Sequence, residues 1–213
     1  MASVSQWRQK LTTYQISQLW KPNWNGRSIM SDDRGPHFVD AVNTGERDMP
    51  EVRAADELTM LTAMLDWYRD GVRLKVADLT HEQANRVLVH SGTTISGLVK
   101  HLALDEDAWF TYRFADGGSP PPWDTAPLDV DDDWDFHSAK DDSVEEVLEL
   151  YAAACDRSRA VTAATTGDLD TPAAVEWADF TLRWVLVHML EETARHMGHI
   201  DILRELIDGR TGE

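Results

Sequence analysis

Residues 181–208, with the sequence TLRWVLVHMLEETARHMGHIDILRELID, decide the fold of this chain of 213 residues. The stretch predicts one long amphipathic helix, because at about 100° per residue its apolar side chains gather on one face. The apolar residues that we expect to be buried on that face are Val185, Met189, Leu203, Leu206 and Ile207. The polar residues that share it are His188, Glu192, His196 and His199. Burying a carboxylate and imidazoles without partners is costly, so the pattern predicts that these groups either pair internally or hold a metal.

Glu192 and His196 are the centre of the metal hypothesis. Residues four apart project side by side from successive turns of a helix, so these two can reach one ion together. Zinc favours such ligands and, in catalytic sites, takes three protein ligands and leaves one position open. Two histidines and a carboxylate also suit ferrous iron. The alternative is that Glu192 pairs with Arg195 or with a basic residue on another helix, and that the histidines are ordinary core or boundary residues.

Three earlier segments also have helical periodicity. They cover residues 55–72, residues 94–115 and a segment that opens at Val144, behind the capping box of Ser143 and Glu146. With four helices and no convincing strand, we predict an all-α fold, specifically a four-helix bundle.

The 27 residues 116–142 separate the second and third predicted helices. They are rich in Pro and Gly and then in Asp, which predicts a solvated crossover with some aromatic anchoring. A connection of this length lets the two helices run parallel. Gly209 is a typical C-terminal cap for the last helix.

His101 lies on the edge of the apolar stripe of the second predicted helix, and Asp105 follows one turn later. In the simplest interpretation His101 is the third metal ligand, and Asp105 orients an imidazole by accepting its second N–H. Taken separately, His101 could be a satisfied core histidine and Asp105 an exposed acid.

Composition limits the partners and the compartment. A net charge of -18 argues against nucleic acid, because phosphate binding needs clustered Lys and Arg. No apolar run approaches membrane-spanning length, so we expect no membrane partner. The single cysteine, Cys155, cannot form an internal disulfide, which fits a reducing cytoplasm, and its place on an apolar stripe predicts a small buried core residue.

Residues 1–54 predict an irregular lead-in to a domain that covers residues 55–209. Residues 1–29 contain basic residues and no Asp or Glu, and they lack the apolar core of a signal peptide. We interpret them either as a peripheral arm that docks through its tryptophans or as a start-site artefact, with the true start at Met30.

Two runs carry a resemblance to a known family: SGTTISGLVKHLALDEDAWF at residues 91–110 and HMLEETARHMGHIDILRELIDG at residues 188–209. They resemble the DinB superfamily, especially its actinobacterial branch of small proteins of unknown function. That superfamily includes bacillithiol and mycothiol S-transferases and the metal-binding domain of mycothiol-dependent maleylpyruvate isomerase. The resemblance covers roughly residues 55–209. It implies an up-down-down-up four-helix bundle and a metal triad of His101, Glu192 and His196.

The chain departs from the family pattern in places. Many members have His at the position of Glu192, although the isomerase branch has Glu. Asp105 stands where relatives usually have an apolar residue, and His90 precedes Ser91 where Pro is common. The isomerase's separate C-terminal domain has no counterpart after residue 209, so we do not expect maleylpyruvate isomerisation.

The resemblance implies a metal-dependent thiol S-transferase that joins mycothiol or a similar low-molecular-weight thiol to an electrophile. Zinc is the favoured metal, with nickel and iron as alternatives, and the supporting candidates for orientation or proton transfer are His188, His199 and Asp105. The rival is a non-catalytic metal-binding or small-molecule-binding bundle, with a homodimer as one form. A third alternative is a metal-free interaction protein.

Overall fold

The computed structural model describes residues 47–211. The predictions for residues 1–29, as an arm or a start-site artefact, lie outside the described residues, as does most of the predicted lead-in. Residues 47–56 form neither helix nor strand.

The described residues are helical, which confirms the all-α prediction for this part of the chain. Residues 47–211 contain no strand, only an isolated antiparallel bridge between Pro172 and Thr181. The helical segments in chain order are α2 (Glu57–Val76), α3 (His81–Ala84), α4 (Ile95–Glu106), the π-helix η1 (Asp107–Phe114), α5 (Trp134–Ser138), the 3₁₀-helix η2 (Ala139–Asp141), α6 (Val144–Ala164) and α7 (Leu182–Asp208).

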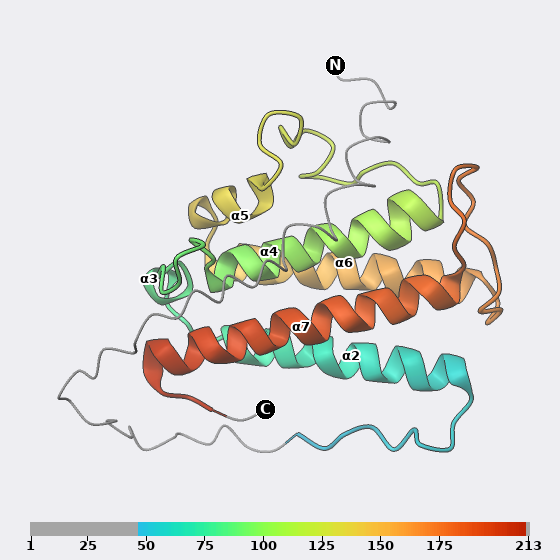
Figure 1. Ribbon diagram of the computed structural model, residues 1–213, viewed down its shortest axis with the longest axis horizontal. Coiled ribbons are helices and arrows are strands. Elements are labelled where there is room, and N and C mark those ends of the chain that lie inside the picture. Colours follow the sequence, from blue (N-terminus) through green and yellow to red (C-terminus); the bar gives the residue numbers. More distant parts are fainter. Residues whose placement is uncertain (1–46, 212–213) are drawn as a thin grey trace, which may run out of the picture.

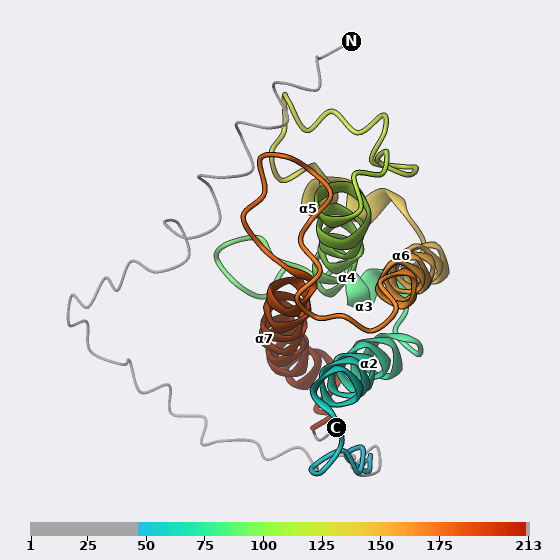
Figure 2. The ribbon, with the colours of Figure 1, turned by 90° about the vertical axis from the view of Figure 1, so that its right-hand side faces the viewer.

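The four long helices α2, α4, α6 and α7 lie side by side (Figure 1). In that view α2 and α7 run from right to left, and α4 and α6 run from left to right. Seen along the helices in Figure 2, they form a ring in which α7 lies between α2 and α4, and α6 lies on the other side of α4. The facing sides of α4 and α7 can therefore contribute to one site.

Side-chain caps explain where several helices begin. Ser143 and Glu146 form the predicted capping box of α6, and Thr80 and Gln83 form one at the start of α3. The last helix ends where predicted, at Gly209, whose φ of 76° is in the left-handed region that favours glycine.

The second predicted helix is not uniform. Residues 94–115 were expected to form one α-helix, but α4 gives way to the π-helix η1 at Asp107. A π-helical turn holds more residues than an α-turn, so it rotates the side chains that follow it relative to those of α4. Trp109 and Arg113 lie on this rotated segment, and both are buried.

The prediction of a solvated crossover was wrong for part of residues 116–142. The short segments α5 and η2 pack against α4, and Trp123, Asp135 and Ala139 are buried. The aromatic anchoring is present, because the indole N–H of Trp123 donates a 2.8 Å hydrogen bond to the Asp107 carboxylate. The packing of α5 on α4 also places a polar residue, Asp135, in the interior.

The inward face of α7 largely follows the expected pattern. Val185, Met189 and Leu203 are buried as predicted, but Leu206 is exposed. The reason is angular: Leu206 lies about 60° round the helix from Val185, at the edge of the stripe. His199 lies on the same edge and is also exposed.

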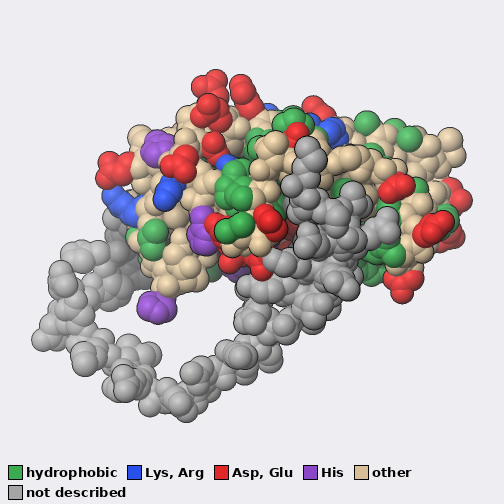
Figure 3. Space-filling view, turned by 90° about the horizontal axis from the view of Figure 1, so that it is seen from above, with side chains coloured by type: hydrophobic (Ala, Val, Ile, Leu, Met, Phe, Trp, Pro, Cys, Tyr) green, Lys and Arg blue, Asp and Glu red, His purple; other side chains and the backbone are tan. Residues whose placement is uncertain are grey.

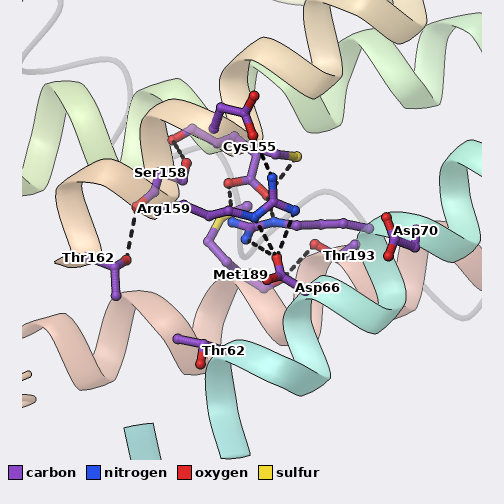
Figure 4. A network of polar contacts seen from close by, with 12 residues as sticks. Thr62, Asp66, Asp70, Cys155, Ser158, Arg159, Thr162, Met189 and Thr193 are labelled. Carbon is purple, nitrogen blue, oxygen red and sulfur yellow. Dashed lines mark hydrogen bonds and ion pairs between the residues drawn. The ribbon is translucent and has the colours of Figure 1, made fainter. Parts of the chain in front are cut away.

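A buried ion pair joins α2 to the end of α4. Arg69 donates to both oxygens of Glu106, at 2.7 and 2.6 Å, and Glu106 is 0% exposed. Figure 4 shows Asp66, Cys155 and Arg159 in the same network. Cys155 is buried, as predicted, and its thiol lies 3.8 Å from a Glu106 oxygen. Burial, with the nearby charge of Glu106, raises the pKa of the Cys155 thiol, which makes a nucleophilic thiolate unfavourable here.

The surface is predominantly acidic. On the face seen from above in Figure 3, acidic side chains are widespread and basic ones are few, in keeping with the net charge of -18. None of the described helices combines the length and the apolar character that crossing a membrane requires. The absence of a nucleic-acid partner stays a prediction.

A pair of arginines near the end of α7 gives a test of pH-dependent stability. A hydrogen bond from Arg204 lowers the pKa of Asp78 against the opposing effect of burial, and the charges of Arg204 and Arg210 lower it further. The stabilisation that ionised Asp78 contributes is therefore present above the pKa that Asp78 has in the unfolded chain. It is lost as the pH falls through the lower pKa of Asp78 in the folded chain.

We expect Asp78→Asn to lower the free energy of unfolding by about 0.5–1 kcal/mol at pH 7, since Asp78 is partly exposed and its charges are screened. The difference in the free energy of unfolding between the native chain and Asp78→Asn should shrink as the pH falls to about 3. Urea unfolding across this pH range measures it, and a difference that grows as the pH falls would contradict the assignment.

Candidate metal centre

The packing of α4 against α7 places the three predicted metal ligands near one another, although their ligand atoms are not all within 4.8 Å of each other. The rings of His101 on α4 and His196 on α7 lie 5.1 Å apart, nearly perpendicular to each other. On α7, the four-residue spacing places the Nε2 atom of His196 3.4 Å from Glu192 Oε2. Glu192 and His196 are buried. The arrangement therefore joins two imidazoles and one carboxylate between two helices.

His101 is oriented by a residue that the sequence interpretation missed. Its Nδ1 lies 2.7 Å from Oδ2 of Asp135, which is 2% exposed on α5, and its ring stacks on Phe136 at 4.7 Å. A carboxylate at this distance favours the tautomer with the proton on Nδ1, which leaves Nε2 as the nitrogen that can bind a metal. Carboxylate, imidazole and metal commonly lie in this order in metal sites.

Asp105 is buried next to the other nitrogen of His101. Its Oδ2 lies 3.3 Å from Nε2, and its exposure of 4% excludes the alternative of a solvent-facing acid. We expected Asp105 to orient an imidazole, but Asp135 makes that contact to His101. Asp105 lies instead on the side of the ring that would face a metal. Burial raises the pKa of its carboxyl group against the lowering effect of His101.

Glu192 also makes the pairing that the alternative interpretation predicted. Its Oε1 accepts a 2.8 Å hydrogen bond from Arg195, while Oε2 faces His196. Burial would raise the pKa of Glu192, but the hydrogen bond with His196 and the charge of Arg195 lower it to about 2. The carboxylate is therefore ionised at neutral pH, the form that a metal needs.

His101 has the opposite preference in the metal-free protein. Burial alone would lower its pKa, but Asp105, Asp135 and Glu192 together raise it to about 9. The ring is then protonated at neutral pH, and metal binding would have to release that proton.

The two remaining histidines of α7 differ in environment. His188 is stacked on Trp184 at 4.9 Å and lies edge-on to Trp109 at 4.5 Å, and burial lowers its pKa. His199 is exposed, although its Nδ1 lies 3.3 Å from Nδ1 of His196. Of the two, His188 is the one that faces the interior of the site.

A different set of possible ligands, which shares Glu192 with the predicted triad, has its ligand atoms closer together. Within residues 47–211, ligand atoms of His188, Glu191 and Glu192 all lie within 4.8 Å of one another. Glu191 is exposed and pairs with Arg195. This set differs from the predicted triad in two of its three members, so experiments must distinguish them.

The match to known families covers both helices of the site. The family model described as mycothiol-S-transferase matches residues 60–209. The chain belongs to this family. The family is part of the DinB-like superfamily, which confirms the resemblance seen in residues 91–110 and 188–209. The search of curated proteins found no match.

Asp135 gives a sharp test of how this family member positions His101. We expect Asp135→Asn to weaken divalent-metal binding by about 10–100-fold, because the charge that fixes the His101 ring is lost. Asp133→Asn, an exposed neighbour, is the matched control and should bind metal like the native chain. Competition with a chromophoric chelator measures both affinities. Equal affinities of the two variants would show that Asp135 does not support the metal.

Proposed function

We propose that this chain is a metal-dependent mycothiol S-transferase that joins a low-molecular-weight thiol to an electrophile. The observation that carries the proposal is that His196 lies beside both His101 of α4 and Glu192 of α7, within the residues that match the family. The proposal includes an up-down-down-up four-helix bundle over residues 55–209, which the directions and contacts of the long helices support. A homodimer and a cytoplasmic location remain predictions.

The residues present fit a divalent metal. Two imidazoles and a carboxylate suit zinc, with nickel and iron as the alternatives. Buried polar atoms without hydrogen-bond partners lie beside them, namely Oδ2 of Asp105 and Nε2 of His188. A metal bound by His101, Glu192 and His196 would lower the pKa of a coordinated thiol and favour the thiolate that attacks electrophiles.

The chain's own residues have separate tasks in this proposal. Asp135 holds the His101 ring, and Arg195 holds the Glu192 carboxylate from the solvent side. His188 offers a buried nitrogen without a hydrogen-bond partner, which can accept the proton of the thiol. The sulfur then bonds to the electrophilic carbon, and either a leaving group departs with its electron pair or the adduct takes up a proton.

One observation favours the non-catalytic alternative. Asp105 lies beside the same nitrogen of His101 that would bind the metal. If its carboxylate fills the fourth coordination position, the site is closed, as in structural zinc sites, and no thiol can bind the metal. The Asp105→Ala variant separates the two alternatives. If Asp105 fills the fourth coordination position, the variant should gain an open position. If the site is catalytic, the variant should keep its transferase activity.

The test of activity uses the purified full chain loaded in turn with zinc, nickel or iron, with mycothiol and monobromobimane as substrates. We expect conjugate formation above the rate without protein, and its loss in His101→Ala. His90→Ala, an exposed histidine outside the site, is the matched control and should retain the activity. Conjugation that persists in His101→Ala, or that never exceeds the uncatalysed rate with any of the three metals, would contradict the proposal.

A further inference from the structure

Beside the candidate metal centre, polar groups without partners gather between η1 and α7. The indole Nε1 of Trp109 and Nε2 of His188 are buried, and neither has a hydrogen-bond partner within the described structure. Trp109 and His188 are in direct contact at 4.5 Å between ring centres. Buried polar groups are normally satisfied, so a group of them in one place indicates a ligand or ordered water.

Arg113 is the basic residue next to Trp109. Arg113 is 4% exposed, and its guanidinium carbon lies 4.0 Å from the centre of the Trp109 ring, over the ring face. Within residues 47–211 it makes no hydrogen bond or ion pair, and the charge of Asp105 acts on it only from beyond ion-pair distance. Burying a guanidinium without a paired anion is costly. By contrast, the buried Arg69 and Arg204 both have carboxylate partners.

Aromatic rings form a wall next to Arg113. Trp109 contacts Trp184 at 5.0 Å, and Trp184 contacts Phe180 at 5.3 Å and stacks on His188 at 4.9 Å. Trp184 is 45% exposed, so the wall reaches from the buried guanidinium to solvent. Such a surface binds a flat, apolar group by stacking.

We propose that Arg113 and this aromatic wall form a binding subsite for a planar or aromatic carboxylate. Arg113 and the Trp109 indole are donors only, and a carboxylate offers only acceptor oxygens, so it matches both. The inference rests on the proposed function in one respect: it makes the electrophile that receives the thiol an aromatic or conjugated carboxylate. His188, which contacts both Trp109 and Trp184, connects the subsite to the proposed metal ligands.

Benzoate and its neutral analogue benzamide are the probes, and their dissociation constants for the metal-free full chain are measured by titration calorimetry. We expect benzoate to bind about tenfold more tightly than benzamide, as a charge-assisted hydrogen bond requires. Arg113→Gln should remove this preference, and Arg113→Lys should retain part of it. Arg73→Gln, an exposed arginine on α2, is the matched control and should leave it unchanged.

Because these measurements need neither metal nor thiol, their result is independent of transferase activity. Failure of the activity assay with a preserved benzoate preference would remove the electrophile assignment and keep the carboxylate subsite. Equal binding of the two probes, no binding of either, or a preference that survives in Arg113→Gln would overturn the subsite. Circular dichroism checks that Arg113→Gln is folded, and if it is not, Trp109→Phe, which keeps the ring and loses the N–H donor, should weaken benzoate binding selectively.

Discussion

Replacing Arg69 by Met is expected to lower the free energy of unfolding by about 3–5 kcal/mol, the typical cost of leaving one partner of a buried ion pair alone. Glu106 is 0% exposed and receives both of its close hydrogen bonds from Arg69. Without Arg69, the thiol of Cys155 is the one side-chain contact that the Glu106 carboxylate keeps among residues 47–211. Chemical denaturation at pH 7 measures the loss.

The matched control is Arg73→Met, one turn further along α2. Arg73 is exposed and lies 3.7 Å from Asp70, so its loss should cost less than about 1 kcal/mol. The double variant Arg69→Met, Glu106→Leu should recover most of the lost stability, because an apolar pair of similar volume often replaces a buried ion pair without net cost. Equal destabilisation by Arg69→Met and Arg73→Met would mean that the buried pair contributes little.

The helices could be predicted from sequence because their signals are local. Period-3.6 patterns located α2, α6 and α7, and the capping residues Ser143 and Gly209 marked two of their ends. The π-helical turn at Asp107 could not be predicted, because it leaves the spacing of apolar residues almost unchanged. The Arg69–Glu106 pair depends on how α2 packs on the rest of the chain, which no spacing within one helix encodes.

The contrast between signals within one helix and contacts between elements also explains which residues of the candidate site could be predicted. Glu192 and His196 were found because four-residue spacing on one helix brings two side chains together. Asp135 was missed because α5 has only five residues and follows a stretch rich in Pro and Asp, so no periodicity shows that its carboxylate turns inward. Arg113 was missed because it lies on η1, where the side chains are rotated relative to a continued α-helix.

Replacing both His101 and His196 by Ala is expected to abolish metal binding. The variant removes two of three proposed ligands and leaves Glu192, which alone gives only weak binding. It also leaves the second set of possible ligands intact, namely His188, Glu191 and Glu192. A metal held by that set would therefore persist in the double variant and be lost in His188→Ala, whereas a metal held by the predicted triad would show the reverse. His90→Ala again serves as the control.

The most direct test of the account is the metal content of the purified chain, measured by elemental analysis after reconstitution with zinc, nickel or iron and removal of free ions. We predict about one equivalent of one divalent metal in the native chain and in His90→Ala, and none in the His101→Ala, His196→Ala double variant. If neither the native chain nor the double variant held metal, the polar residues of α7 would be a structural pairing, and if both held one equivalent, the metal would lie at the set of His188, Glu191 and Glu192. Either result would contradict the predicted triad and the transferase mechanism proposed on it.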